Sequence, residues 1–152
     1  MIKQFLNLSL VFSVIFITSC GYEPLNKTTS INVIDISDKV FSGNKSINRK
    51  IFNKLNINET NDNSGYIFKL HSESKIIILA KDNSGNATSY KTNMIIQLSL
   101  IKDEKIMKNK RFEKNFTYSN LNNKFELSKY QKQVENNMIN SLVQEIRIFL
   151  DF

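Results

Sequence analysis

The 152-residue sequence is poor in the residues that most often build disulfide, metal or catalytic centres. It has one cysteine, one histidine, one proline and four glycines, and it has no tryptophan. A single cysteine excludes a disulfide within one chain, so the core has to be held by packing alone. One histidine and one cysteine also exclude the usual zinc ligand sets. The scarcity of glycine and proline favours a compact domain.

A long hydrophobic run is also lacking. The apolar stretch 5–17 is broken by three polar residues and stops well short of the roughly 20 residues that a membrane-spanning helix needs. Lys3 gives the chain a positive start, and small residues follow the stretch. This order is typical of a secretory signal peptide, so we expect the chain to be exported and residues 1–19 to be removed.

The residues Ile17-Thr18-Ser19-Cys20 at the end of this leader have the pattern of a lipobox. Cleavage after thioether lipidation would make Cys20 the first residue of the mature protein, held on a membrane by its acyl chains. The alternative is a chance cysteine beside an ordinary cleavage site. By resemblance to bacterial lipoproteins as a class, Gly21 in place of aspartate favours sorting to the outer membrane, with the protein on its periplasmic side.

The mature chain has the size and charge of one basic domain. Removal of residues 1–19 leaves 133 of the 152 residues, which suits a single core. The formal net charge falls from +7 to +6 because Lys3 leaves and no acidic residue does. Export argues against nucleic acid as the partner, so lipid headgroups, phosphorylated glycolipids or an acidic protein surface are the expected anions. We expect a tether at 20–30 and a domain at 31–152.

Hydrophobic periodicity predicts four strands and two helices in this domain. Strands are predicted by alternation of apolar and polar residues, and helices by apolar residues three and four apart. The predicted elements are a strand at 31–36, a short helix carrying Ile47, Ile51, Phe52 and Leu55, strands at 66–80 and 90–100, a strand containing Phe112, Phe116 and Tyr118, and a helix at 128–150 opened by a capping box at Ser128. Loops are predicted at 58–65, 81–86 and 102–105.

The predicted fold class is α+β with the order β-α-β-β-β-α. Both helices carry one apolar stripe and the strands carry one apolar face, so we expect an antiparallel four-stranded sheet with the two helices packed on one face. The other face of the sheet is expected to be polar and basic.

Residues that would support an enzyme are not visible. The histidine, His71, lies in mid-strand beside Lys69 and Glu73, where a partly solvated strand residue is the simpler interpretation. The run 81–85 lacks the strand, glycine-rich loop and helix of a phosphate cradle. We therefore expect a protein that is not an enzyme and has no cofactor or metal. A deep pocket uniting His71 with an acid and a hydroxyl would revive a hydrolase hypothesis.

Positive charge is the candidate functional feature. Several basic residues are predicted on the polar face of the sheet or at the hairpin tip, where they could bind the phosphates of a glycolipid. They are Lys69, Lys75, Lys81, Lys91, Lys108, Lys110, Arg111 and Lys114. The alternative is an ordinary solvated face that discourages pairing at the sheet edge.

Several stretches together resemble the lipopolysaccharide-assembly lipoprotein family, LptE. They are Cys20-Gly21-Tyr22-Glu23-Pro24-Leu25, the strand–helix–strand opening, Ala87-Thr88-Ser89-Tyr90 after a polar hairpin, and the closing helix from Tyr130 to Leu150. The resemblance covers nearly the whole mature chain and implies a plug and assembly partner of the large β-barrel that inserts lipopolysaccharide into the outer leaflet, the LptD type.

The same resemblance implies which residues contact lipopolysaccharide. Lys81 is nearest by position to a basic residue near the family's hairpin, although relatives carry arginine there. Lys124 or Lys129 corresponds to a basic residue before the last helix. Lys75 and Lys91 complete the predicted set because of their charge on the polar face of the predicted hairpin, not because of the resemblance. A competing hypothesis is an outer-membrane lipoprotein that tethers the envelope or serves another barrel-assembly machine.

Overall fold

The computed structural model describes residues 34–60 and 65–150. The chain divides into two units, 1–31 and 32–152, and the described residues belong to the second. The predicted signal peptide, the lipidation site Cys20 and the tether at 20–30 lie outside the described residues. No helix within 34–60 and 65–150 has the length and apolar character needed to cross a bilayer.

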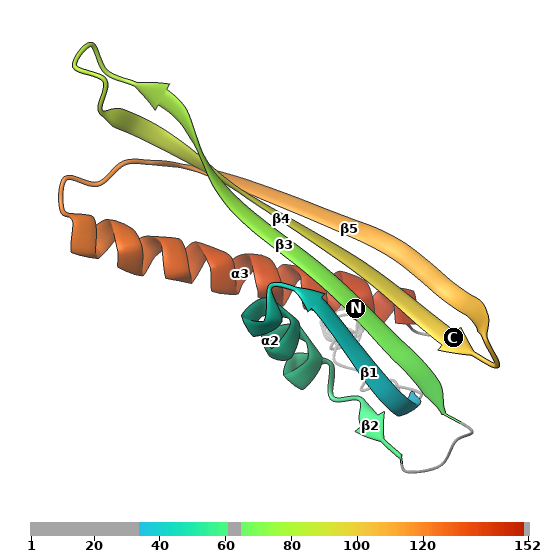
Figure 1. Cartoon of the computed structure of the whole chain (residues 1–152). Coiled ribbons are helices and arrows are strands. Elements are labelled where there is room, and N and C mark those ends of the chain that lie inside the picture. Colours follow the sequence, from blue (N-terminus) through green and yellow to red (C-terminus); the bar gives the residue numbers. More distant parts are fainter. Residues whose placement is uncertain (1–33, 61–64, 151–152) are drawn as a thin grey trace, which may run out of the picture. The chain divides into compact units, whose positions relative to one another are not determined.

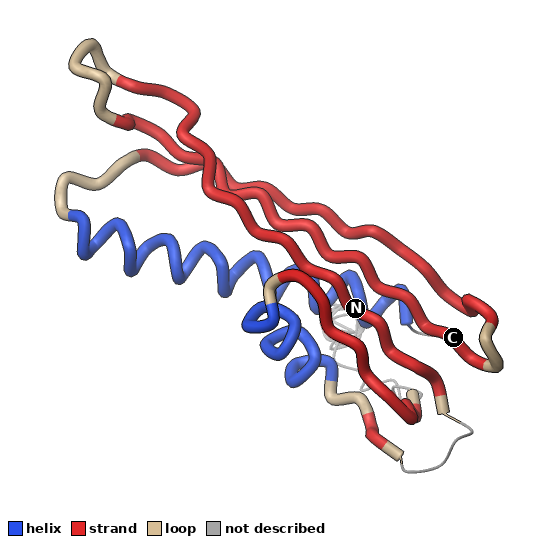
Figure 2. Tube along the Cα trace, viewed as in Figure 1, coloured by secondary structure: helices blue, strands red, loops and turns tan. Residues whose placement is uncertain are grey.

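A five-stranded mixed sheet carries two helices (Figures 1 and 2). The elements in chain order are β1 (Asp35–Gly43), α2 (Lys45–Leu55), β2 (Asn58–Glu59), β3 (Tyr66–Lys81), β4 (Ala87–Lys102), β5 (Lys105–Ser119) and α3 (Lys124–Leu150). The strand order is β2-β1-β3-β4-β5. β1 runs parallel to both β2 and β3, whereas β3, β4 and β5 form an antiparallel meander.

The predicted antiparallel four-stranded sheet is therefore wrong. The connection from β1 to β3 passes through α2 and brings the chain back parallel to β1, as a strand–helix–strand crossover does. The fifth strand is β2, a two-residue strand inside the segment predicted as a loop. It is too short to show any alternation of apolar and polar residues. The first strand also lies later than predicted, at 35–43.

Local side-chain hydrogen bonds set the helix boundaries. Asn44 caps α2, since its Oδ1 accepts hydrogen bonds from the backbone N–H groups of Ser46 and Ile47. Asn123 caps α3, because its Oδ1 accepts from the N–H of Phe125 at 2.8 Å. The long helix thus begins at Lys124 rather than at the predicted capping box of Ser128.

The core lies between the sheet and the two helices, which cover the same face and contact each other (Figure 1). Lys50 of α2 pairs with Glu135 of α3 at 2.8 Å. The fully buried large side chains come from both layers, and they are Phe68, Ile36, Ile47, Ile51, Leu70, Met94, Ile96, Leu98, Leu100, Ile139, Leu142 and Ile146. Burial of this apolar surface is the main force that holds the helices on the sheet.

Candidate functional site

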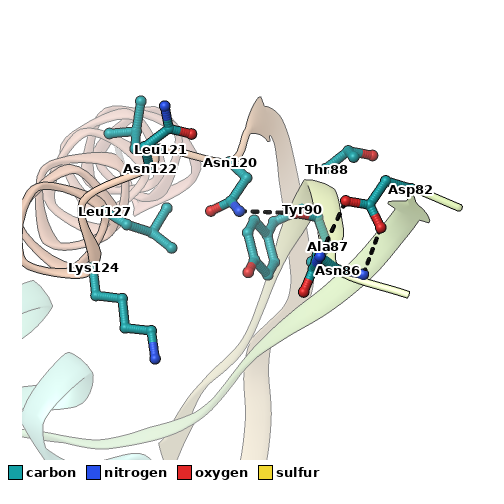
Figure 3. Close-up of a pocket in the computed structure, with 10 residues that line it drawn as sticks. All are labelled: Asp82, Asn86, Ala87, Thr88, Tyr90, Asn120, Leu121, Asn122, Lys124 and Leu127. Carbon is teal, nitrogen blue, oxygen red and sulfur yellow. Dashed lines mark hydrogen bonds between the residues drawn. The ribbon is translucent and has the colours of Figure 1, made fainter. Parts of the chain in front are cut away.

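A polar cleft lies between the tip of the β3–β4 hairpin and the start of α3 (Figure 3). We call it the tip cleft, and its volume is about 520 Å³. It is lined by Asp82, Asn86, Ala87, Thr88, Tyr90, Asn120, Leu121, Asn122, Lys124 and Leu127. Amides, hydroxyls and one lysine can all hydrogen-bond to the oxygens of sugars and phosphates, so the cleft offers several donors to a polar ligand.

The hairpin wall of the tip cleft is built by Asp82. One carboxylate oxygen accepts from the backbone N–H groups of Ser84 and Asn86, both at 2.8 Å, and the other accepts from the side-chain amide of Asn86 at 3.2 Å. These hydrogen bonds from Asn86 and Ser84 hold the pKa of the Asp82 carboxyl below its ordinary value. Gly85 supplies the positive φ of +83° that the turn requires. These contacts stabilise the turn at the tip of the hairpin.

The wall opposite the hairpin tip is connected to β4 by Asn120. Its side-chain amide donates to the Ala87 carbonyl at 2.8 Å, and its backbone N–H donates to the Thr88 carbonyl at 2.8 Å. Tyr90 stacks on Tyr118 with ring centroids 5.7 Å apart, and Tyr118 meets Tyr130 of α3 edge to face. These aromatic contacts fix the start of α3 against the hairpin, so both walls are positioned by regular elements rather than by loops alone.

The four lysines predicted to bind glycolipid do not share one surface. Lys124 lines the tip cleft on the helix side of the sheet. Lys75 lies opposite Asn93 and Lys91 lies opposite Ile77, which makes them diagonal neighbours on the face turned away from the helices. Lys81 ends β3 beside the tip. The structure thus separates a lysine in a cleft from a pair on an open face.

Three basic residues of β5 have structural partners on the helix side instead. Lys108 donates to the Phe149 carbonyl at 3.0 Å and to the Leu150 carbonyl at 3.4 Å, at the end of α3. Lys114 pairs with Glu145 at 2.7 Å. The ammonium of Lys110 lies 5.4 Å from the ring centroid of Phe149. These residues dock α3 and do not extend the predicted basic face.

The face turned away from the helices carries acidic residues beside its basic ones. Glu73 pairs with Lys75 at 3.8 Å, and Arg111 pairs with Glu113 at 3.1 Å. The hydrogen bond from His71, followed by the charge of Lys75, lowers the pKa of the Glu73 carboxyl. Glu73 and Glu113 thus pair with basic residues and offset part of the positive charge on this face.

His71 links a hydroxyl and a carboxylate on that face. Its Nδ1 lies 2.9 Å from Ser42 Oγ, and its Nε2 lies 3.2 Å from Glu73 Oε1. This chain of groups has the composition of a nucleophile, base and acid. The sequence places His71 beside Glu73, and the structure adds Ser42. Both His71 and Glu73 are partly exposed, and none of the three residues lines the tip cleft. Catalysis by such a chain also requires a substrate pocket and oxyanion donors beside the serine, so a solvated hydrogen-bond chain is the simpler interpretation.

Sequence patterns missed the amide wall of the tip cleft. Asn120 and Asn122 lie more than 30 residues from the hairpin tip, and short polar connections carry no periodicity that would bring the two together. The described residues contain no group of three or more histidine, cysteine, aspartate or glutamate side chains suited to hold a metal.

Solved structures of several proteins named as lipoproteins have a fold similar to that of this chain. No family model matches the sequence, and no curated protein matches it. The crystal structure of the rare lipoprotein B from Shewanella oneidensis matches with a TM-score of 0.55 and 15% identity, over 72% of this chain and 89% of that one. A minor lipoprotein from Acinetobacter baumannii matches with a TM-score of 0.57 and 12% identity, over 78% and 91%. The solution structure of a lipoprotein B from Nitrosomonas europaea matches with a TM-score of 0.55 and 12% identity, over 76% of this chain and 83% of that one.

Proposed function

We propose that this chain is a non-enzymatic outer-membrane lipoprotein that assists the β-barrel through which lipopolysaccharide reaches the outer leaflet, and that it holds the phosphorylated sugar headgroup in the tip cleft. The tip cleft carries this proposal. It combines one lysine and the Asp82 carboxylate with amide and hydroxyl groups, which suits a ligand that has sugar hydroxyls for the acid and a phosphate for the lysine. Acylation at Cys20 would keep the cleft close to the membrane where such ligands reside.

Two further observations support the proposal. The fold is that of solved proteins named as lipoproteins, and this chain spans 83 to 91% of their lengths. The resemblance of the sequence to the lipopolysaccharide-assembly lipoproteins supplies the barrel as partner. A compact α+β domain can occupy a barrel lumen, which is polar in barrels of this kind.

Direct binding tests the glycolipid part of the proposal. The full-length acylated protein is titrated with purified lipopolysaccharide, and Lys124→Met is compared with Lys105→Met. Lys105 is a matched control because it begins β5, directly after the β4–β5 turn and away from the tip cleft. We expect Lys124→Met to weaken binding about fivefold, the effect of losing one cation close to an anionic group. Equal affinities of the two variants would remove the tip cleft from the proposal.

Co-purification tests the partner. The full-length tagged protein is extracted from its own membranes in mild detergent, and proteins present in stoichiometric amount are identified. A single large β-barrel is the expected result. A monomer, or a complex with peptidoglycan or with a general barrel-assembly machine, would instead support an envelope tether or accessory.

A further inference from the structure

The outer half of β3 has an open edge. β1 pairs with β3 from Tyr66 to Ser72 and ends at Gly43, whereas β4 accompanies β3 as far as Lys81. The segment Glu73–Lys81, which we call the free edge, therefore has no strand on its β1 side within the part of the chain that the structure describes. Figure 2 shows this part of the hairpin projecting past the end of β1.

The middle of the free edge is apolar on both faces. Ile76, Ile77, Ile78 and Leu79 are exposed by 51%, 48%, 48% and 50%. Alternation along the strand puts Ile76 and Ile78 on the helix side and Ile77 on the opposite side. Single exposed apolar residues are ordinary on a protein surface. Four consecutive ones place apolar surface on both faces of the same strand, which is typical of an interaction site.

The backbone of the free edge also points outward at every second residue. The Ser72 carbonyl accepts a hydrogen bond from the Asn44 N–H at 2.8 Å, so the backbone groups of Ser72 point toward β1. Because these groups alternate in direction along a strand, those of Ser74, Ile76 and Ile78 point the same way, where β1 has ended. The groups of the intervening residues point toward β4.

β5, an outer strand of the sheet, differs from the free edge because basic residues interrupt its exposed apolar residues. β5 carries basic residues along its first ten residues, at Lys105, Lys108, Lys110, Arg111 and Lys114. Lysines along an edge strand discourage pairing with another chain. On the free edge the lysines stand only on either side of the apolar run, at Lys75 and Lys81.

Three kinds of occupant can be distinguished physically. Hydrocarbon of a bilayer would cover the apolar side chains, but each unpaired backbone group would cost free energy there. A second copy could pair its own free edge antiparallel to this one. Its hairpin tip would then extend alongside residues 66–72 of β3, a position that β1 already occupies. An extended segment of another protein satisfies the backbone and covers both faces without that conflict.

We propose that the free edge of β3 is a docking strand for an extended segment of a partner protein. The segment would carry apolar or β-branched residues opposite Ile76–Leu79 and an acidic residue within reach of Lys75 or Lys81. It would extend the sheet in line with β1. This interaction surface does not depend on glycolipid binding in the tip cleft, since no residue from 73 to 81 lines that cleft.

Photocrosslinking in cells tests the proposal with the full-length acylated protein. A benzophenone amino acid is placed singly at Ile76 and at Ile78, which share one side of the strand. The controls are Ile106 and Ile148, apolar residues that are 63% and 77% exposed away from the free edge. We expect both test positions to attach to one partner protein, at residues two apart in one continuous segment. Attachment to lipid, to a second copy, or at scattered partner residues would overturn the proposal.

A pair of substitutions tests the backbone contribution separately. Ile76→Pro removes an N–H that points to the free edge and leaves the hydrogen bonds to β4 in place. Ile76→Thr reduces the side chain but keeps the N–H. With the crosslinker at Ile78, we expect the yield to fall about tenfold or more in Ile76→Pro and less than about threefold in Ile76→Thr, because an unmade buried hydrogen bond is costly. Equal yields in the two variants would refute strand pairing. Thermal melts of both variants check that the fold is kept, and the residue spacing found by crosslinking does not depend on the proline variant.

Discussion

Two lysines beside opposite ends of α3 are expected to change the stability of the fold in opposite directions when each is replaced by methionine. Lys108 belongs to β5, and its ammonium donates to the carbonyls of Phe149 and Leu150 at the C-terminal end of the helix. Lys124 is the first residue of the helix, directly after its cap Asn123. The helix dipole favours a cation at the C-terminus and disfavours one at the N-terminus.

The structure gives the size of each effect. Lys108→Met loses charge-assisted hydrogen bonds to helix-end carbonyls, the favourable dipole interaction, and the contact of the ammonium with the Phe149 ring at 5.5 Å. Because Lys108 is partly solvated, we expect the free energy of unfolding to fall by about 1–2 kcal/mol. Lys124→Met removes an unfavourable charge, so its free energy of unfolding should be unchanged or rise by a few tenths of a kcal/mol.

Urea unfolding followed by circular dichroism measures both values, and titration with lipopolysaccharide gives the affinity of each variant. Lys108→Met should lose stability and keep its affinity, while Lys124→Met should keep stability and lose affinity about fivefold. The reasoning is refuted if Lys108→Met costs less than about 0.5 kcal/mol, or if Lys124→Met destabilises the fold by more than about 1 kcal/mol.

Three further predictions concern the backbone and the open sheet face. Gly43→Ala should lower the free energy of unfolding by about 2 kcal/mol or more, because φ is +72° and a Cβ would lie 2.1 Å from the Ser72 carbonyl oxygen. Gly85→Ala should lower it by only about 1 kcal/mol, because φ is +83° but no atom lies near the added Cβ. The Glu73 carboxyl should titrate by NMR below its ordinary pKa and move upward in His71→Gln; its stabilising contribution is present above the ordinary pKa and is lost as the pH falls through the lowered one. A fluorophosphonate probe should not label Ser42, and labelling that vanishes in Ser42→Ala would instead establish a reactive serine.

Periodicity predicted the β3–β5 meander and most of α3 because each of these elements is long and buries one face. The position of β1 escaped prediction because its apolar residues are few and Lys39 lies on its helix side, where its ammonium is 4.8 Å from the Phe52 ring centroid. The parallel pairing of β1 and β3 depends on the path through α2, which no local pattern encodes.

The lysines show where a sequence pattern contained the answer. In β5, Lys108, Lys110 and Lys114 share the parity of the buried residues Phe112 and Tyr118. Alternation alone therefore assigns them to the helix side, where their long side chains reach past the apolar layer to α3. The predicted basic face grouped these lysines with Arg111 because all four are basic residues of one strand. Arg111 is odd-numbered and lies on the opposite face of the sheet.

The end of the hairpin has two features that face different neighbours. The tip cleft is formed with α3 and the connection from β5, whereas the free edge lies on the β1 side of β3. No residue belongs to both, so a strand docked on the free edge leaves the cleft open to a ligand. Both proposed sites depend on the same hairpin, whose conformation is stabilised by Asp82 at the tip and by the pairing of β3 with β4. This support would let one domain present the proposed ligand site and the proposed docking strand at once.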